Sequence, residues 1–195
     1  MEADESIAMM KRVVEETSRV VHGVDPSQHD LPTPCGEWSV REVMNHITGG
    51  GELFAICAEQ GAIPDEKLIE LMTVDQLGDE PAANFDRAAD HAFEAFNDPA
   101  ALDRTISLPF GQMPGLAALN LAIFDLTVHA IDIAKATGQS PELDPEVLAV
   151  AYSNAQMMIA DEMRNEEGNP FGFAVEVPDD APVYDKLHAL TGRAV

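Results

Sequence analysis

The segment that most constrains the fold of this chain is the apolar stretch GLAALNLAIFDLTVHAIDIAKATG, residues 115–138. Its residues are apolar on nearly every side of a helix, so we expect a helix over 115–137 that lies buried at the centre of the protein. Lys135 falls in its last turns, and Gly138 is a natural C-terminal cap. The segment therefore predicts the central helix of the fold.

Other helices are predicted where apolar residues recur at three- and four-residue steps. The longer ones cover 5–23, 39 to about 58, 81–97 and 144–164. Ser39 and Glu42 have the spacing of a capping box, which marks the start of the second helix. Trp38, just before that cap, is expected to act as a hydrophobic staple that sets the entry angle of the chain.

The remaining elements are expected to be short. They comprise one helix within the acidic connection 61–80, a hairpin around 105–111, an extended piece in the tail and a final helix near 182–191. The chain has 195 residues, enough for one good hydrophobic core, and it shows no internal repeat. We therefore expect residues 1–195 to form a single, all-α domain that carries at most a small β-hairpin.

The charge balance limits the partners of the protein. There are 35 acidic residues against 11 basic ones, a formal net charge of −24. Nucleic acid and anionic membrane surfaces both require clustered Lys and Arg, so neither is an expected partner. The N-terminus lacks the basic start of a signal peptide, and no apolar run is expected to span a membrane. We expect a soluble, acidic, cytoplasmic protein.

Three polar side chains share one face of the predicted central helix. Asp125 and His129 are four residues apart, and Asp132 follows three residues later. The rest of that face is alanine, so these groups are expected to be buried. A buried carboxylate is costly unless it is paired or binds a metal. Either a hydrogen-bonded Asp–His pair that bridges helices or a metal site would explain the pattern.

A third candidate ligand comes from the helix that begins at Ser39. His46 lies on the flank of its apolar stripe and is followed by three glycines, residues 49–51. Glycine costs about 1 kcal/mol in a helix interior, so this run either bends the helix or leaves space for another group. Together His46, Asp125 and His129 would form a facial set suited to a divalent transition metal, with open positions for water or substrate.

The other reactive side chains are weaker candidates. Cys35 precedes the second helix, whose positive end could lower the pKa of its thiol, or it packs as a small loop residue. Cys57 is expected in the core. The remaining histidines are expected at the surface, at positions 22, 29, 91 and 188. The sequence holds no phosphate-binding loop, dinucleotide fingerprint or nucleophile elbow, and no residue stands out as a separate general base.

Two motifs resemble a known family. The stretch TPCGEWSVREVMNHITGG, residues 33–50, resembles the T-P-C-x-x-W-[ST]-V-R-[DE]-[LV]-x-x-H-[LIV] motif of DinB/YfiT-like metalloproteins. FDLTVHAIDIAKATGQ, residues 124–139, is similar to a block of the actinobacterial group that includes the metal-binding domain of mycothiol-dependent maleylpyruvate isomerase. The tail from residue 171 is similar to the ending of a compact subgroup, so the resemblance covers nearly the whole chain.

The resemblance implies a four-helix bundle of up-down-down-up type with a divalent metal near one end. The family's ligands map onto His46, Asp125 and His129, and Asp132 maps onto an acid that would orient a ligand histidine. Asp125 is one methylene shorter than the glutamate expected in the isomerase, and Ile131 stands where that block usually has tryptophan. The isomerase has a further C-terminal domain, so its own reaction is not carried over to this chain.

Three functions remain open from the sequence. The first is a metal-dependent thiol S-transferase or isomerase, in which zinc, or nickel, cobalt or manganese, binds a small thiol such as mycothiol for attack on an electrophile. The second is a metal-binding or sensing protein without turnover. The third is a structural bundle that uses its Asp–His pair internally. Monomer and homodimer both remain open.

Overall fold

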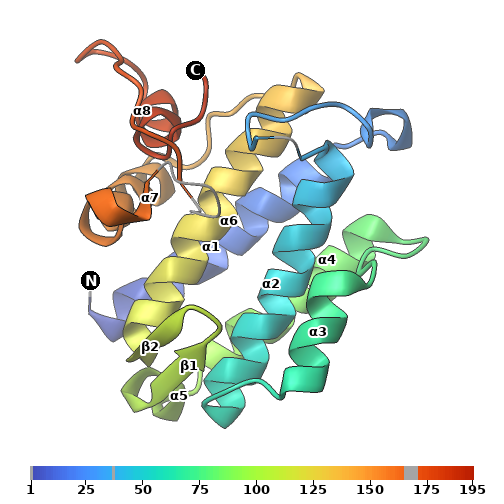
Figure 1. The fold of residues 1–195 in the computed structure, drawn as a ribbon, viewed down its shortest axis with the longest axis vertical. Helices are drawn as coiled ribbons and strands as arrows, with labels where there is room; N and C mark the ends of the chain where they lie inside the picture. Colours follow the sequence, from blue (N-terminus) through green and yellow to red (C-terminus); the bar gives the residue numbers. More distant parts are fainter. Residues whose placement is uncertain (1, 37, 165–170) are drawn as a thin grey trace.

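The computed structural model describes residues 2–36, 38–164 and 171–195. Four long helices form the body of the protein (Figure 1). Each matches a segment predicted from the apolar pattern: α1 (Ala3–His22), α2 (Val40–Gln60), α4 (Pro81–Phe96) and α6 (Gly115–Thr137). The all-α class with one small hairpin is confirmed.

Helices α1 and α6 run in the same direction. Near one end the hydroxyl of Ser6 donates to the Asn120 side chain over 3.3 Å, and near the other the amide of Gln139 donates to the Val20 carbonyl over 2.9 Å. Chain position therefore increases along both helices together.

Helices α2 and α4 also run in the same direction. Arg41, at the start of α2, donates to the carbonyl of Gly78 just before α4 begins, whereas Glu59 near the end of α2 pairs with His91. The connection between them therefore returns along the bundle, and part of it forms α3 (Asp65–Thr73). Arg104 donates to the Glu59 carbonyl near the end of α2 and accepts from the amide of Gly115 at the start of α6, so α2 is antiparallel to α6. The four helices therefore have the expected up-down-down-up topology.

The central helix is buried as its composition predicts. Every residue from Leu126 to Ala134 is buried, and Gly138 ends the helix in the left-handed conformation with φ of 73°. By length and hydropathy α6 also qualifies as a membrane span, contrary to our expectation that no segment would. However, 72% of the qualifying window is buried inside the protein, as befits the core helix of a bundle.

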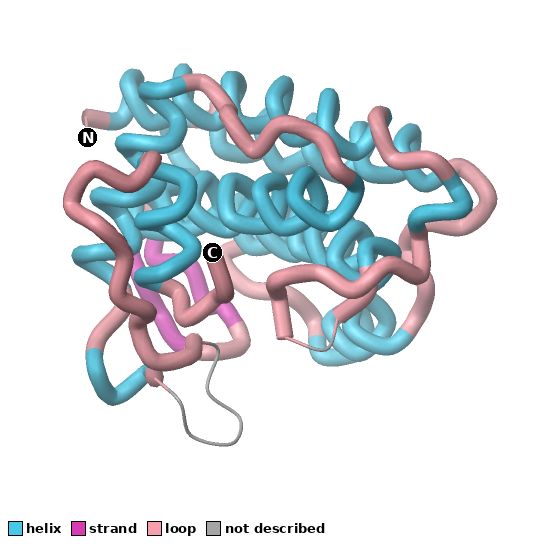
Figure 2. The backbone as a smooth tube through the Cα atoms, turned by 90° about the horizontal axis from the view of Figure 1, so that it is seen from above, coloured by secondary structure: helices cyan, strands magenta, loops and turns pink. Residues whose placement is uncertain are grey.

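Short elements complete the fold. Strands β1 (Thr105–Leu108) and β2 (Gly111–Pro114) form the expected hairpin, which Figure 2 shows beside a body made of helices and loops. A further helix, α5 (Pro99–Asp103), was not predicted, although Asp98 caps it and Pro99 starts it, which is a readable signal. Short 3-10 turns cover Pro26–Gln28 and Asp161–Met163.

The C-terminal part of the chain packs beside α6 as two helices, α7 (Pro145–Met158) and α8 (Val183–Leu190) (Figure 1). The prediction that α7 reaches residue 164 is wrong. Ile159 leaves the helical conformation with ψ of 97° and packs against the core, and a 3-10 turn follows. This change of direction lets the tail return toward α6.

Candidate metal centre

The structure brings together the three side chains that the sequence singled out. His46 extends from α2, and Asp125 and His129 extend from the facing side of α6. One oxygen of Asp125, Oδ1, lies 3.6 Å from Nε2 of His46 and also 3.6 Å from Nε2 of His129. The two imidazole rings lie edge to face with their centres 4.8 Å apart. The three ligand atoms therefore face a common point.

These separations fit a metal ion better than direct hydrogen bonds. A charge-assisted N–H···O bond is about 2.7–2.9 Å long, shorter than the 3.6 Å seen here. Two ligand atoms about 2.1 Å from one tetrahedral ion lie about 3.4 Å apart. The His46 side chain is 38% exposed whereas that of His129 is 7% exposed, so the set is enclosed on one side and open on the other.

The charges within the set are matched to one another. Burial raises the pKa of Asp125, but the neighbouring His129 and His46 outweigh it and hold that pKa at about 2. Burial lowers the pKa of His46, yet Asp125 more than compensates and the net shift is upward. Asp125 is therefore a carboxylate at neutral pH, the form in which it can bind a cation.

Asp132 lies behind His129, on the side away from Asp125. Its Oδ2 is 3.0 Å from Nδ1 of His129, and the carboxylate is fully buried. Because a carboxylate only accepts hydrogen bonds, Nδ1 carries the proton and the lone pair of Nε2 points toward Asp125 and His46. This is the position that an orienting carboxylate would need, and that role of Asp132 stays a prediction.

The glycine run in α2 serves mainly to bring helices close. A Cβ at Gly51 would lie 3.0 Å from the carbonyl oxygen of Ala88 in α4, and one at Gly49 would lie 3.1 Å from that of Leu71 in α3. At these two positions the group that uses the space is the backbone of a neighbouring helix, not a ligand. Gly50 alone faces the candidate metal site, with Asp125 as its neighbour. The helix continues through all three residues.

Trp38 covers the histidines at the open side. Its ring centre lies 4.9 Å from that of His46 and 6.3 Å from that of His129, and the residue is 39% exposed. Trp38 therefore contacts the site, and the staple role expected for it stays a prediction. The chain holds no other tryptophan, so its fluorescence reports on this region.

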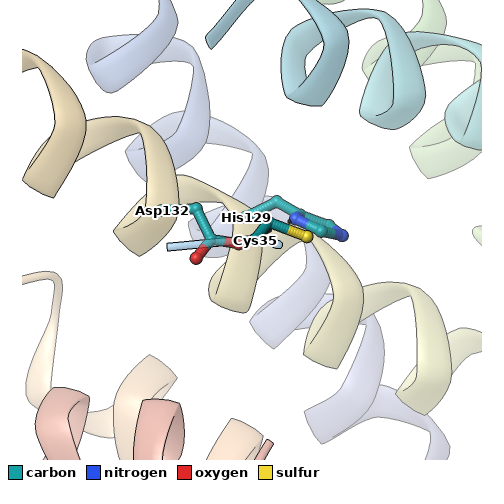
Figure 3. A group of neighbouring side chains, drawn as sticks. All are labelled: Cys35, His129 and Asp132. Carbon is teal, nitrogen blue, oxygen red and sulfur yellow. Dashed lines mark hydrogen bonds and ion pairs between the residues drawn. The ribbon is translucent and has the colours of Figure 1, made fainter. Parts of the chain in front are cut away.

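Cys35 also lies beside the site. Figure 3 shows it with His129 and Asp132 along one side of α6, and their ligand atoms are within 4.8 Å of one another. Of the two alternatives for Cys35, the lowered pKa is not found, because burial raises the pKa of its thiol to about 11, whereas packing as a small loop residue agrees with its place against the core. The metal-free protein therefore holds this residue as a thiol.

Two residues of the tail were not expected at the site. Arg193 donates from Nε to both oxygens of Asp132 over 2.9 and 3.0 Å, and from Nη2 to Cys35 over 3.2 Å. His188, expected at the surface, is fully buried with Nε2 3.4 Å from Asp132. Burial lowers the pKa of His188 to about 4, so its ring is neutral. Neither residue has a sequence signal beyond the glycine that precedes Arg193.

The remaining side chains lie near their expected positions. Cys57 is fully buried in the core. His22 and His91 pair with carboxylates at or near the surface, and His29 is partly buried in the loop before α2. None of the three histidines joins a candidate metal cluster among the described residues.

An up-down-down-up bundle with a His–Asp–His set between two of its helices defines the class of DinB-like helical proteins. The chain belongs, more narrowly, to the family of the mycothiol maleylpyruvate isomerase N-terminal domain, whose sequence model matches residues 10–134. The resemblance found in the sequence is thereby confirmed.

Proteins and structures similar to this chain support the same placement. Two uncharacterized proteins of Mycobacterium tuberculosis, Rv0738 of strain H37Rv and MT0763 of strain CDC 1551, are each 31% identical over 185 residues, 95% of this chain and 96% of the relative. The crystal structure of mycothiol-dependent maleylpyruvate isomerase matches with a TM-score of 0.60 at 13% identity. A histidine-to-alanine mutant of that enzyme matches with a TM-score of 0.62 at 12% identity. Both matches cover 80% of this chain and 70% of the isomerase chain, and they establish the shared fold.

Proposed function

We propose that this protein binds one divalent metal ion through His46, Asp125 and His129, with Asp132 orienting His129. The observation that carries the proposal is the single carboxylate oxygen that lies 3.6 Å from an imidazole nitrogen on each side. Two nitrogen ligands and one oxygen ligand suit zinc best, and nickel, cobalt and manganese are the alternatives.

We further propose that the metal serves a thiol S-transferase or isomerase that uses a small thiol such as mycothiol and a small electrophilic substrate. Membership in the isomerase family and the fold shared with the mycothiol-dependent enzyme support the thiol. A bound divalent ion would hold that thiol deprotonated at neutral pH. The chemistry would take place in the cytoplasm, within a single domain spanning residues 1–195.

The residues of the chain divide the work between the two sides of the site. Asp125 supplies the negative charge that attracts the cation, and the imidazoles of His46 and His129 supply neutral nitrogen ligands. The exposed part of His46 and the neighbouring ring of Trp38 mark the side from which a thiol can enter. On the opposite side, Asp132 excludes water from Nδ1 of His129 and fixes the proton there.

Metal content tests the first part of the proposal. Elemental analysis of untagged protein purified without chelator should find close to one divalent ion per chain, and Asp125→Ala should lower that content sharply. The matched control is Asp86→Ala, which removes a carboxylate that pairs with His22 away from the site. Full occupancy in the Asp125 variant would contradict the ligand assignment.

Cobalt spectroscopy tests the thiol. Cobalt-loaded protein titrated with mycothiol or another small thiol should develop a sulfur-to-metal charge-transfer band in the near ultraviolet, because a thiolate is a soft ligand. Cys35→Ser should retain the band, which would show that the sulfur comes from the added thiol. A cobalt protein that shows no band with any biological thiol would favour a metal-binding or sensing protein without turnover.

A further inference from the structure

The C-terminal tail, residues 171–195, ends against the candidate metal centre. Helix α8 is anchored to α6 by an ion pair between Lys135 and Asp185, 2.7 Å long. Beyond α8 the backbone amide of Arg193 donates to the His188 carbonyl, which closes the helix end in the manner of a Schellman motif. The side chain of Arg193 is thereby directed back toward α6.

Gly192 makes this turn possible. Its φ is 81°, which favours glycine, and a Cβ there would lie 2.4 Å from the Cα of Gly172. The amide of Gly172 donates in turn to the Thr191 carbonyl, so the two parts of the tail hold each other. The position of Arg193 is therefore built into the backbone of the tail.

Arg193 occupies the place of a cation between Cys35 and Asp132. These two residues and His129 form a second set of possible metal ligands, but the guanidinium already lies 2.9–3.0 Å from the carboxylate and 3.2 Å from the sulfur. On one side, His129 is linked through Asp132 to the guanidinium of Arg193. On its other side, His129 faces His46 and Asp125, the other two candidate metal ligands. Arg193 is 8% exposed, so water screens this arrangement little.

We propose that Arg193 is a positioning residue that holds Asp132 against Nδ1 of His129 and thereby makes the C-terminal tail a working part of the metal site. The inference rests on the proposed metal binding at His129. Asp132 has two oxygens, and the Nε–H of Arg193 contacts both, which fixes the plane of the carboxylate. Without that contact the carboxylate loses its charged partner, and the hydrogen bond that supports the ring of His129 from behind is less firmly oriented.

Metal affinity is the first test, with Arg193→Gln as the variant. The dissociation constant for zinc, from competition with a chromophoric chelator, should rise toward the ~10- to 100-fold that is usual when the direct partner of a ligand histidine is removed. Arg193→Lys keeps the charge but not the planar fork, so the zinc affinity of this variant should be intermediate between those of the wild type and Arg193→Gln. Fluorescence of Trp38 during the titration confirms that the ion enters the same site.

Lys135→Met is the matched control. It removes another charged anchor of the tail, the pair with Asp185, without touching Asp132. Zinc affinity close to wild type in Lys135→Met, together with the loss in Arg193→Gln, would support the proposal. Equal losses in both variants would show that any loosening of the tail is sufficient, and unchanged affinity in Arg193→Gln would also overturn the proposal.

A metal-free measurement separates this inference from the metal itself. The 15N shifts of the His129 ring should show the proton on Nδ1 in the wild type and a mixture of tautomers in Arg193→Gln. Far-ultraviolet circular dichroism checks that both proteins are folded. If the wild type binds no zinc, the proposed function fails, whereas an unchanged His129 tautomer in a folded Arg193 variant overturns the role of Arg193 alone.

Discussion

Two histidines of this protein are each flanked by two carboxylates, yet their surroundings differ. His129 belongs to α6 and lies between Asp125 and Asp132. His91 belongs to α4, and its ring pairs with Glu52 and Glu59 of α2. We call the first the α6 cluster and the second the α4 cluster. Composition alone would not distinguish them.

The α4 cluster is complete as it stands. Both ring nitrogens of His91 lie within hydrogen-bond distance of a carboxylate, at 3.0 and 3.2 Å, and the three side chains are 31–46% exposed. In the α6 cluster only Nδ1 of His129 has such a partner, while Nε2 stays 3.6 Å from Asp125 and shares that oxygen with His46. The free Nε2 of His129 is the nitrogen that we propose binds a metal together with Asp125 and His46.

The largest expected difference between the clusters is in metal binding. His129→Ala should abolish it, because one of three protein ligands is lost and Asp125 and His46 cannot hold the ion alone. His91→Ala should leave the metal content unchanged. Elemental analysis of both variants after the same purification makes the comparison. Loss of metal in the His91 variant would place the ion between α2 and α4 and would contradict our assignment.

A second difference is expected in folding stability. Asp132→Ala leaves the Arg193 guanidinium buried without its counter-charge, and breaking such a pair costs about 3–5 kcal/mol. Glu52→Ala removes one partner of a partly exposed histidine and should cost about 0.2–1 kcal/mol. Urea unfolding of the metal-free proteins gives both values. Similar losses in the two variants would mean that burial does not separate the clusters.

Alanine substitutions at two glycines of α2 compare how tightly the α4 side and the α6 side of this helix are packed. Gly51→Ala places a methyl group 3.0 Å from the Ala88 carbonyl on the α4 side and should cost about 1–3 kcal/mol. Gly50→Ala meets only Asp125, at 4.0 Å on the α6 side, and should stabilise the helix by up to about 1 kcal/mol. Opposite signs in urea unfolding are expected, and a loss at Gly50 would show that the α6 side is also tightly packed.

The fold was more predictable than the surroundings of the site because helices depend on local patterns. The capping box at Ser39, the apolar composition of α6 and the cap at Gly138 are all readable within a few residues. The spacing of Asp125 and His129 likewise placed them on one face, and the glycine-flanked position of His46 singled it out as their partner. The family resemblance then mapped its ligands onto the same three residues. Local patterns also predicted the hairpin, which depends on a short turn.

The parts that sequence reasoning missed depend on distant segments. Arg193 reaches Asp132 across 61 positions, through the turn at Gly192 and the contact with Gly172, and no local pattern encodes that distance. His188 was expected at the surface because a lone histidine near a helix end usually lies there, and only the docking of α8 on α6 buries it. The sequence also could not choose between the two alternatives for Cys35, since the burial that raises its pKa comes from tertiary packing.

The smallest expected effect is a pH dependence confined to the α4 cluster. Burial lowers the pKa of His91, but Glu52 and Glu59 outweigh it, so the pKa in the folded protein is raised above its ordinary value near 6.5. A raised pKa means that the folded state binds the proton more tightly. The contribution to stability is therefore present below about pH 6.5 and is lost as the pH rises through the pKa of His91 in the folded protein.

His91→Gln should accordingly lower the free energy of unfolding at pH 5.5 by about 0.2–1 kcal/mol and have little effect at pH 8.5. In a background of Glu52→Gln and Glu59→Gln the difference between the two pH values should disappear. Urea unfolding at the two pH values measures it, and a larger loss at pH 8.5 would show that the neutral ring, not the charged one, holds α2 to α4.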